Sequence, residues 1–113
     1  MEELYLSHNG IEKMCGLDTL ARLKILDLGG NRIKQVEGLG KLVHLSDLWL
    51  NDNAIGESSS LEESFESGVA CVRETLTTVY LEGNPAVVRD SAAYKQKMRE
   101  WLPNLKQLDY EDV

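Results

Sequence analysis

The sequence predicts an α/β solenoid, with a short parallel β-sheet on its concave face, 3₁₀ and short helical turns on its convex face, and a helical cap at the carboxy-terminal end. Three observations lead to this class. An eight-residue framework recurs as LYLSHNGI at residues 4–11, LDLGGNRI at 26–33 and LWLNDNAI at 48–55. Its central asparagine returns every 22 residues. The leucines of each copy alternate with variable residues, which is the two-residue period of a strand with one buried face.

The repeat continues beyond these three copies. LTTVYLEGNPA at residues 76–86 is a fourth unit, and LKQLDYED at 105–112 is a partial fifth. A period of about 20 to 29 residues with this pattern is the signature of leucine-rich repeats. Residues 1–88 are therefore predicted to hold four repeat units, with an insert at about 56–75, and residues 89–113 a carboxy-terminal cap.

The two halves of each unit are predicted to form different layers. In the strand half, the inward side chains are Leu4, Leu6, Leu26, Leu28, Leu48, Leu50, Val79 and Leu81. In the other half, apolar residues recur every three positions, which suits short turns on the convex side. They are Ile11, Met14, Leu17, Leu20, Ile33, Val36, Leu39 and Leu42. No unit can bury its apolar face alone, so each coil depends on its neighbours.

The repeated asparagine is predicted to belong to the scaffold rather than to a binding site. The chain turns sharply after each strand and buries backbone groups that need partners. An Asn amide both accepts and donates hydrogen bonds, so Asn9, Asn31, Asn53 and Asn84 can satisfy the turns of neighbouring coils, whereas Asp could only accept. Asn84, beside the atypical last unit, is expected to tolerate replacement better than Asn31.

The insert is predicted to form a short helix on the convex side, followed by a loop. Ser60 and Glu63 match a capping box, Leu61 and Phe65 are spaced to share one face, and Gly68 is expected to stop the helix. The serines before this helix could alternatively be a phosphorylation site, but a solvated helix entry is favoured.

The segment after residue 89 is predicted to cap the solenoid with a second helix. Asp90 or Ser91 supplies the amino-terminal cap, and the helix ends before Pro103. Its apolar face consists of Tyr94, Met98, Trp101 and Leu102. A solenoid needs such a terminal unit to cover its last core layer, so Trp101 is predicted to belong to the core.

The amino-terminal end carries no comparable cap. Met1 stands where later units have Leu23, Leu45 and Leu76, so the chain opens in the middle of a repeat. We therefore expect it to be part of a longer array, with the strand at residues 3–7 on an open edge.

The amino-acid composition limits which classes of partner and which cellular compartment are expected. The formal net charge is −7 and the pI is about 4.8. This balance argues against nucleic acid and against anionic membranes, because both select basic surfaces, and it suits a basic protein partner. Cys15 and Cys71 form no paired motif, and neither a signal peptide nor a long apolar run is found. The cytoplasm or the nucleus is therefore expected.

The sequence contains no recognisable catalytic or metal-binding constellation. His8 and His44 lie in different parts of the coil, and neither has a cysteine or a paired carboxylate at ligand spacing. The Ser, Cys and His residues form no nucleophile arrangement that sequence could support. We therefore expect a protein that is not an enzyme and that uses no cofactor and no metal.

The residues that vary between copies are predicted to form the binding surface, because the constant ones belong to the scaffold. Those at the centres of successive strands point outward on the concave face: Tyr5, Asp27, Trp49, Tyr80 and Asp109. Asp47 and Glu82 flank this column on its two sides. Aromatic rings and carboxylates on one face suit a protein partner that presents Arg or Lys. These seven residues are the predicted partner-binding site.

Four stretches carry a resemblance to a known family: LYLSHNGI, LWLNDN, VYLEGNP and YKQKMREWLPNLKQLD. Across nearly all 113 residues, the sequence resembles the carboxy-terminal part of the regulatory subunit 7 family of protein phosphatase 1, intracellular leucine-rich-repeat proteins. The resemblance implies binding of the phosphatase catalytic subunit through the concave face, at positions matched here by Asp27, Asp47, Trp49 and Tyr80. Two departures are that the family's earlier repeats are absent and that residues 58–74 form a longer insert.

A structural role in a ribonucleoprotein particle or an axonemal dynein complex is the alternative hypothesis. Proteins of that kind share the repeat period and the cap. They are expected to carry a different concave column, or a basic rim for a partner that bears nucleic acid. The identity of the partner therefore separates the two hypotheses.

Overall fold

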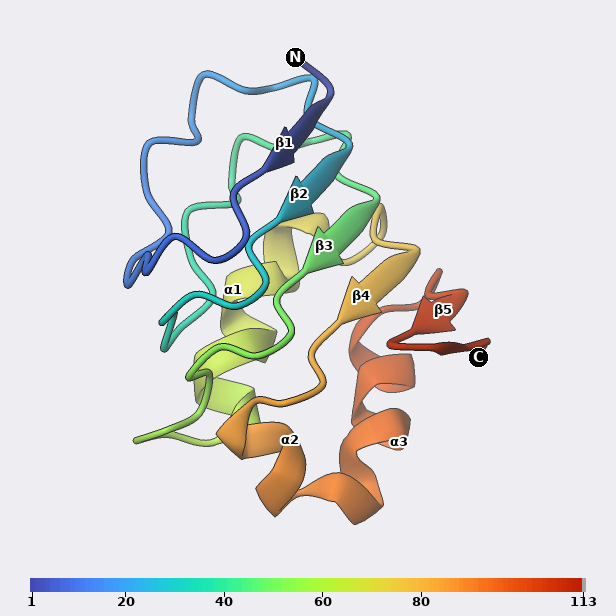
Figure 1. Ribbon diagram of the computed structural model, residues 1–113. Helices are drawn as coiled ribbons and strands as arrows, with labels where there is room; N and C mark the ends of the chain where they lie inside the picture. The colour runs from blue at the N-terminus through green and yellow to red at the C-terminus, as the bar shows by residue number, and fades with distance from the viewer. Residues whose placement is uncertain (113) are drawn as a thin grey trace.

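The computed structural model describes residues 1–112 and shows one sheet with turns and helices on its far side (Figure 1). Its six strands follow chain order: β1 (Glu3–Tyr5), β2 (Ile25–Asp27), β3 (Asp47–Trp49), β4 (Thr78–Tyr80), β5 (Gln107–Leu108) and β6 (Glu111–Asp112). The first five are parallel, and β6 turns back antiparallel to β5. The predicted leucine-rich-repeat solenoid is confirmed.

The repeat register is kept across the whole sheet. The residues paired at the centres of the parallel strands are Leu4, Leu26, Leu48, Val79 and Leu108. Leu26, Leu48 and Val79 are completely buried, so the side chains beneath the sheet form one aliphatic core. Leu4 and Leu6, which were also predicted to be buried, are only partly so. The reason is that no coil in residues 1–112 covers the outer side of β1.

The convex side of the first two coils consists of isolated turns. The N–H of Leu20 donates to the carbonyl of Leu17 at 3.0 Å, and one repeat later the N–H of Leu42 donates to the carbonyl of Leu39 at 3.0 Å. These are three-residue turns of the 3₁₀ kind, as the spacing of the apolar residues predicts.

The insert forms a longer helical run than the sequence predicts. It consists of a π-helical turn η1 (Glu62–Glu66), α1 (Ser67–Val69) and a 3₁₀ turn η2 (Ala70–Val72). Ser60 and Glu63 form the first half of the predicted capping box, since the N–H of Glu63 donates to the Ser60 hydroxyl at 3.1 Å. The Glu63 carboxylate accepts that hydroxyl at 3.2 Å and not the backbone N–H of Ser60, as a complete capping box would require.

Gly68 does not end this run, so that part of the prediction is wrong. A Cβ at Gly68 would lie 1.9 Å from the carbonyl oxygen of Val36, a separation that no side chain could accept without displacing the backbone. Gly68 therefore allows the insert to pack closely against the convex turn of the preceding coil.

The asparagines form the predicted ladder between coils. The Oδ1 of Asn53 accepts the N–H of Ile33 at 3.0 Å, and its Nδ2 donates to the carbonyls of Leu28 at 2.9 Å and Leu50 at 3.1 Å. Asn31 and Asn84 make equivalent bonds. Each amide thus closes its own turn and the turn of the coil before it, which uses both its donor and its acceptor.

Two helices and the final hairpin close the carboxy-terminal end (Figure 1). α2 (Pro85–Arg89) is an element that the sequence did not predict, whereas α3 (Ser91–Trp101) begins and ends where expected. Asp90 is the N-cap residue of α3, but the predicted side-chain cap is wrong, because its carboxylate pairs instead with Lys97.

No helix in the described residues is long and apolar enough to span a bilayer.

Candidate protein-interaction site

The parallel register brings the central residues of the predicted site side by side. Tyr5, Asp27, Trp49 and Tyr80 are consecutive partners across β1 to β4. Each follows an inward-facing strand residue, so its own side chain points away from the core. Asp47 lies on the same face of β3, two residues before Trp49.

Three rings of this column are in contact, and a fourth ring joins them from the hairpin. The ring centroids of Tyr5 and Trp49 lie 5.9 Å apart, those of Trp49 and Tyr80 lie 5.6 Å apart, and those of Tyr80 and Tyr110 lie 5.7 Å apart. These separations are typical of favourable aromatic pairs. Tyr5, Trp49, Tyr80 and Tyr110 together are termed the aromatic ladder below.

Tyr110 is the member of the ladder that the sequence analysis missed. It is 80% exposed and lies between β5 and β6. The preceding residue, Asp109, has φ 56°, in the left-handed region that turns the chain back, and Tyr110 stacks on Tyr80. Strand alternation carries no signal for this position because the hairpin interrupts the repeat. The available signal was an aromatic residue next to the predicted Asp109.

Asp27 lies on the strand between the two that carry Tyr5 and Trp49. Strands two apart in a sheet are about 9.6 Å apart, so the contact between the two rings requires them to lean towards each other across β2. The Oδ1 of Asp27 accepts the N–H of Gly29 at 3.0 Å, which fixes the orientation of the carboxylate. The result is a half-buried carboxylate beside the aromatic pair.

Trp49 forms the centre of the ladder and is half-buried between the two tyrosines. Its neighbours Leu48 and Leu50 are in the core, which agrees with the predicted register. The indole Nε1 is buried and has no hydrogen-bond partner within residues 1–112. A buried donor without an acceptor costs about 1–3 kcal/mol, so the fold keeps an unfavourable group at this position.

Negative charge surrounds the ladder. The Tyr5 hydroxyl donates to the Glu3 carboxylate at 2.8 Å. This hydrogen bond, together with desolvation and the charges of Glu3, Asp27 and Asp47, raises the pKa of Tyr5 above its usual value. No salt bridge in the described part of the chain involves Asp27, Asp47 or Glu82. These carboxylates are therefore open to pairing with a cationic partner.

The last two predicted residues differ in their surroundings. Glu82 is exposed in the turn after β4. Asp109 is engaged by the scaffold, since its Oδ1 accepts the N–H groups of Leu81 at 2.8 Å and Glu82 at 2.9 Å, and its Oδ2 accepts the Tyr94 hydroxyl at 3.0 Å. Burial, followed by the charge of Asp109, raises the pKa of Tyr94 far above its ordinary value. Asp109 thus closes the last coil, and its contact with a partner stays a prediction.

The chemistry of this surface is that of recognition. Ring faces attract cations, and the neighbouring carboxylates can pair with the same groups. Within residues 1–112, no three or more His, Cys, Asp and Glu side chains are grouped so that they could hold a metal ion.

Comparisons with known proteins agree with the repeat pattern. Residues 21–63 match the family described as Leucine Rich repeats (2 copies). The protein phosphatase 1 regulatory inhibitor subunit PPP1R7 homolog of Arabidopsis thaliana is 44% identical over 55 residues, which are 49% of this chain and 17% of that protein. The protein phosphatase 1 regulatory subunit SDS22 of Schizosaccharomyces pombe is 38% identical over 71 residues, which are 63% of this chain and 20% of that protein. The chain thus spans a fifth or less of the length of these two relatives.

A solved structure extends the similarity to almost the whole fold. A chain in the crystal structure of the Drosophila melanogaster SNF/U2A' complex is 26% identical, with a TM-score of 0.62. The match covers 98% of the present chain and 74% of the other.

Proposed function

We propose that this leucine-rich-repeat protein, which is similar in sequence to regulatory subunit 7 of protein phosphatase 1, binds the catalytic subunit of that phosphatase through the concave face of its sheet. Both sequence relatives described above are named as regulatory subunits of this phosphatase. In this proposal the chain is a protein-binding module and not an enzyme. The observation that carries the proposal is the aromatic ladder, with Trp49 at its centre and carboxylates beside it.

Binding is expected to centre on Trp49. A partner Arg or Lys above the ladder would contact a ring face, an interaction worth about 0.5–2 kcal/mol, and would pair with Asp27 or Asp47. The tyrosines on either side exclude water from the indole, which is the arrangement of an energetically dominant interface residue and its surrounding ring. Carboxylates at the rim add attraction at long range and orient a basic partner.

The test is the affinity of the Trp49→Ala variant for the purified phosphatase catalytic subunit, measured by calorimetry. Loss of a central aromatic anchor should weaken binding roughly 30-fold. Val43→Ala, at an exposed apolar residue outside the sheet, is the matched control and should bind like the parent. Unchanged affinity of Trp49→Ala would reject the concave-face assignment.

A second variant keeps the test valid if Trp49→Ala unfolds. Asp47→Lys alters a half-buried side chain at the start of β3 and replaces an attractive charge by a repulsive one. Its affinity should fall at least about tenfold, with a strong dependence on salt, because the charge acts on the encounter as well as on the complex. An Asp47→Lys variant that binds like the parent would also reject the proposal.

A scaffold role in a ribonucleoprotein is the second candidate function. The structural match to a chain of the SNF/U2A' complex over 98% of the present chain favours it. The same calorimetry with the purified SNF and U2A' proteins separates the two candidates. Binding of either of them without binding of the phosphatase would replace the first proposal by the second.

A further inference from the structure

A pocket lies where the β5–β6 hairpin meets α3, at the carboxy-terminal end of the sheet (Figure 1). Its volume is about 270 Å³. Pockets that hold whole small molecules measure roughly 300–1,000 Å³, so this one is sized for a single large side chain. It is termed the hairpin pocket below, and the residues that form its floor and rim include Glu82, Val87, Tyr94, Leu108, Tyr110 and Glu111.

The hairpin pocket shares one wall with the aromatic ladder. Tyr110 lines the pocket and also stacks on Tyr80, with 30° between the two ring planes. Because Tyr110 is 80% exposed, most of its surface remains open to contact. A partner that lies on Trp49 and Tyr80 therefore meets Tyr110 as the next ring, with the pocket directly beyond it.

The floor of the pocket is apolar. Val87, Tyr94 and Leu108 line it, and all three are buried. The hydroxyl of Tyr94 is already used, since it donates to the carboxylate of Asp109 at 3.0 Å. A side chain that enters the pocket thus contacts aliphatic and aromatic carbon, which suits a residue with a long apolar stem.

The lining carries an excess of negative charge. Three carboxylates, those of Glu82, Asp109 and Glu111, stand against one ammonium group, that of Lys95. Lys95 pairs with Glu111, whereas Glu82 takes part in no salt bridge within residues 1–112. Burial is the largest cause of the raised pKa of Tyr94, followed by Asp109, and the charge of Glu82 adds to it. The negative charge of Glu82 is therefore felt at the floor, and the pocket favours a cation.

We infer that the hairpin pocket receives an arginine side chain of the protein that binds the concave face, an inference that rests on the proposed function. The methylene groups of this arginine lie on Val87 and Leu108, and its guanidinium group pairs with Glu82 and contacts the ring of Tyr110. Arginine is favoured over lysine because a planar guanidinium can bind a carboxylate through two N–H groups and can stack on an aromatic ring.

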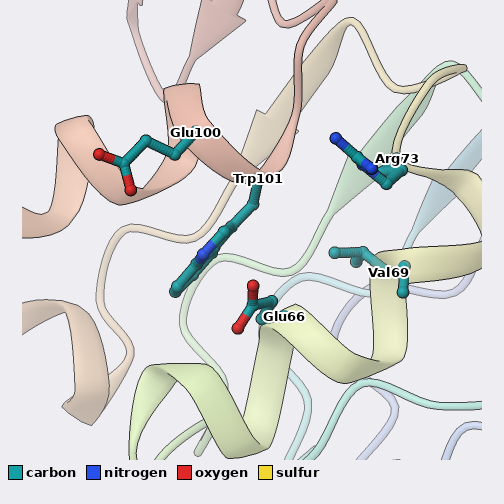
Figure 2. Close-up of a pocket in the computed structure, with 6 residues that line it drawn as sticks. Glu66, Val69, Arg73, Glu100 and Trp101 are labelled. Carbon is teal, nitrogen blue, oxygen red and sulfur yellow. The ribbon is translucent and has the colours of Figure 1, made fainter.

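The first test uses an isolated arginine side chain as the probe. N-acetyl-arginine amide is titrated into ¹⁵N-labelled protein, and its uncharged isostere N-acetyl-citrulline amide into a second sample. The arginine compound should shift the backbone N–H resonances of Leu108 and Tyr110 and should bind roughly fivefold more tightly than the citrulline compound. Trp101 is the internal reference, because it lies in a separate cavity between the insert and α3 (Figure 2). Its indole resonance should not shift.

Glu82→Gln and Glu100→Gln form a matched pair of variants. Each removes one exposed carboxylate, but Glu100 lines the cavity of Figure 2 and not the hairpin pocket. Glu82→Gln should weaken binding of the arginine compound roughly fivefold, and Glu100→Gln should bind it like the parent. No detectable shift, equal affinity for the two compounds, equal effects of the two variants, or shifts confined to Tyr5 and Trp49 would overturn the inference.

Calorimetry with the purified phosphatase catalytic subunit separates this inference from the proposed function. If the subunit binds the parent, Glu82→Gln should weaken that binding roughly fivefold, and Glu100→Gln should leave it unchanged. Equal binding of the parent and Glu82→Gln would overturn the arginine pocket and leave the concave-face function standing. No binding of the parent would reject that function, and the arginine titration would then decide about the pocket.

Discussion

Replacing Asn84 by alanine tests the physical basis of the repeat. Its side chain is completely buried. The Oδ1 accepts the N–H of Ile55 at 3.0 Å, and the Nδ2 donates to the carbonyls of Leu50 and Leu81, both at 2.8 Å. Asn84→Ala removes all three bonds at once. The orphaned N–H costs about 1–3 kcal/mol, and the two carbonyls add less because each keeps a second lone pair.

We expect the free energy of unfolding to fall by about 3 kcal/mol in Asn84→Ala. For a domain of this size, this corresponds to a melting temperature lower by about 12 °C. Urea denaturation followed by circular dichroism measures the change directly. From the sequence, replacement of Asn84 was expected to be better tolerated than replacement of Asn31. The structure reverses this expectation, because Asn84 is at least as buried as Asn31 and makes the equivalent hydrogen bonds.

Asn9→Ala is the matched control for this experiment. Asn9 is exposed, and its Nδ2 donates to the carbonyls of Leu6 and Ser7, while its Oδ1 accepts no hydrogen bond within residues 1–112. Its removal should cost less than about 1 kcal/mol, since water can replace the lost bonds. If Asn84→Ala unfolds at the same urea concentration as the parent, or if Asn9→Ala is equally destabilising, the asparagine ladder does not hold the coils together.

Three further predictions follow from single contacts. Gly68→Ala should lower the free energy of unfolding in urea by about 1–3 kcal/mol, because its Cβ would meet the Val36 carbonyl at 1.9 Å; an unchanged midpoint would contradict this packing. Tyr94→Phe should lower the free energy of unfolding by about 1 kcal/mol, because Asp109 loses the hydroxyl donor at 3.0 Å. Wild-type stability of this variant would show that the hydrogen bond is not needed. Glu3→Gln should lower the pKa of Tyr5 in an ultraviolet titration, since the Glu3 carboxylate is the largest cause of its elevation; an unchanged pKa would refute that cause.

Periodic features could be predicted from the sequence because they depend on neighbours at a fixed spacing. The outward direction of Trp49 follows from the leucines on either side of it, and the register of β1 to β4 follows from the repeat length. The asparagine ladder follows from the chemistry of an amide at a buried turn. The same reasoning identified the candidate residues on the concave face.

Features at the ends of the repeat and between elements could not be predicted in this way. Tyr110 joins the ladder only because Asp109 turns the chain back, and Asp109 itself is held by Tyr94 from a different element. Periodicity says nothing about either contact, since both lie where the repeat stops. The sequence therefore identified the rings at the centre of the aromatic ladder but not Tyr110 at its carboxy-terminal end.

The sequence by itself thus determined the solenoid, its strands and the face on which Tyr5, Trp49 and Tyr80 lie, because alternation and period are local properties of the chain. Only the tertiary structure decided that Gly68 permits close packing rather than ending a helix, and that the Trp49 indole N–H is buried without a partner. These outcomes depend on which atoms of distant segments meet. The distances between such atoms are set by packing of the coils and not by the order of residues within one coil.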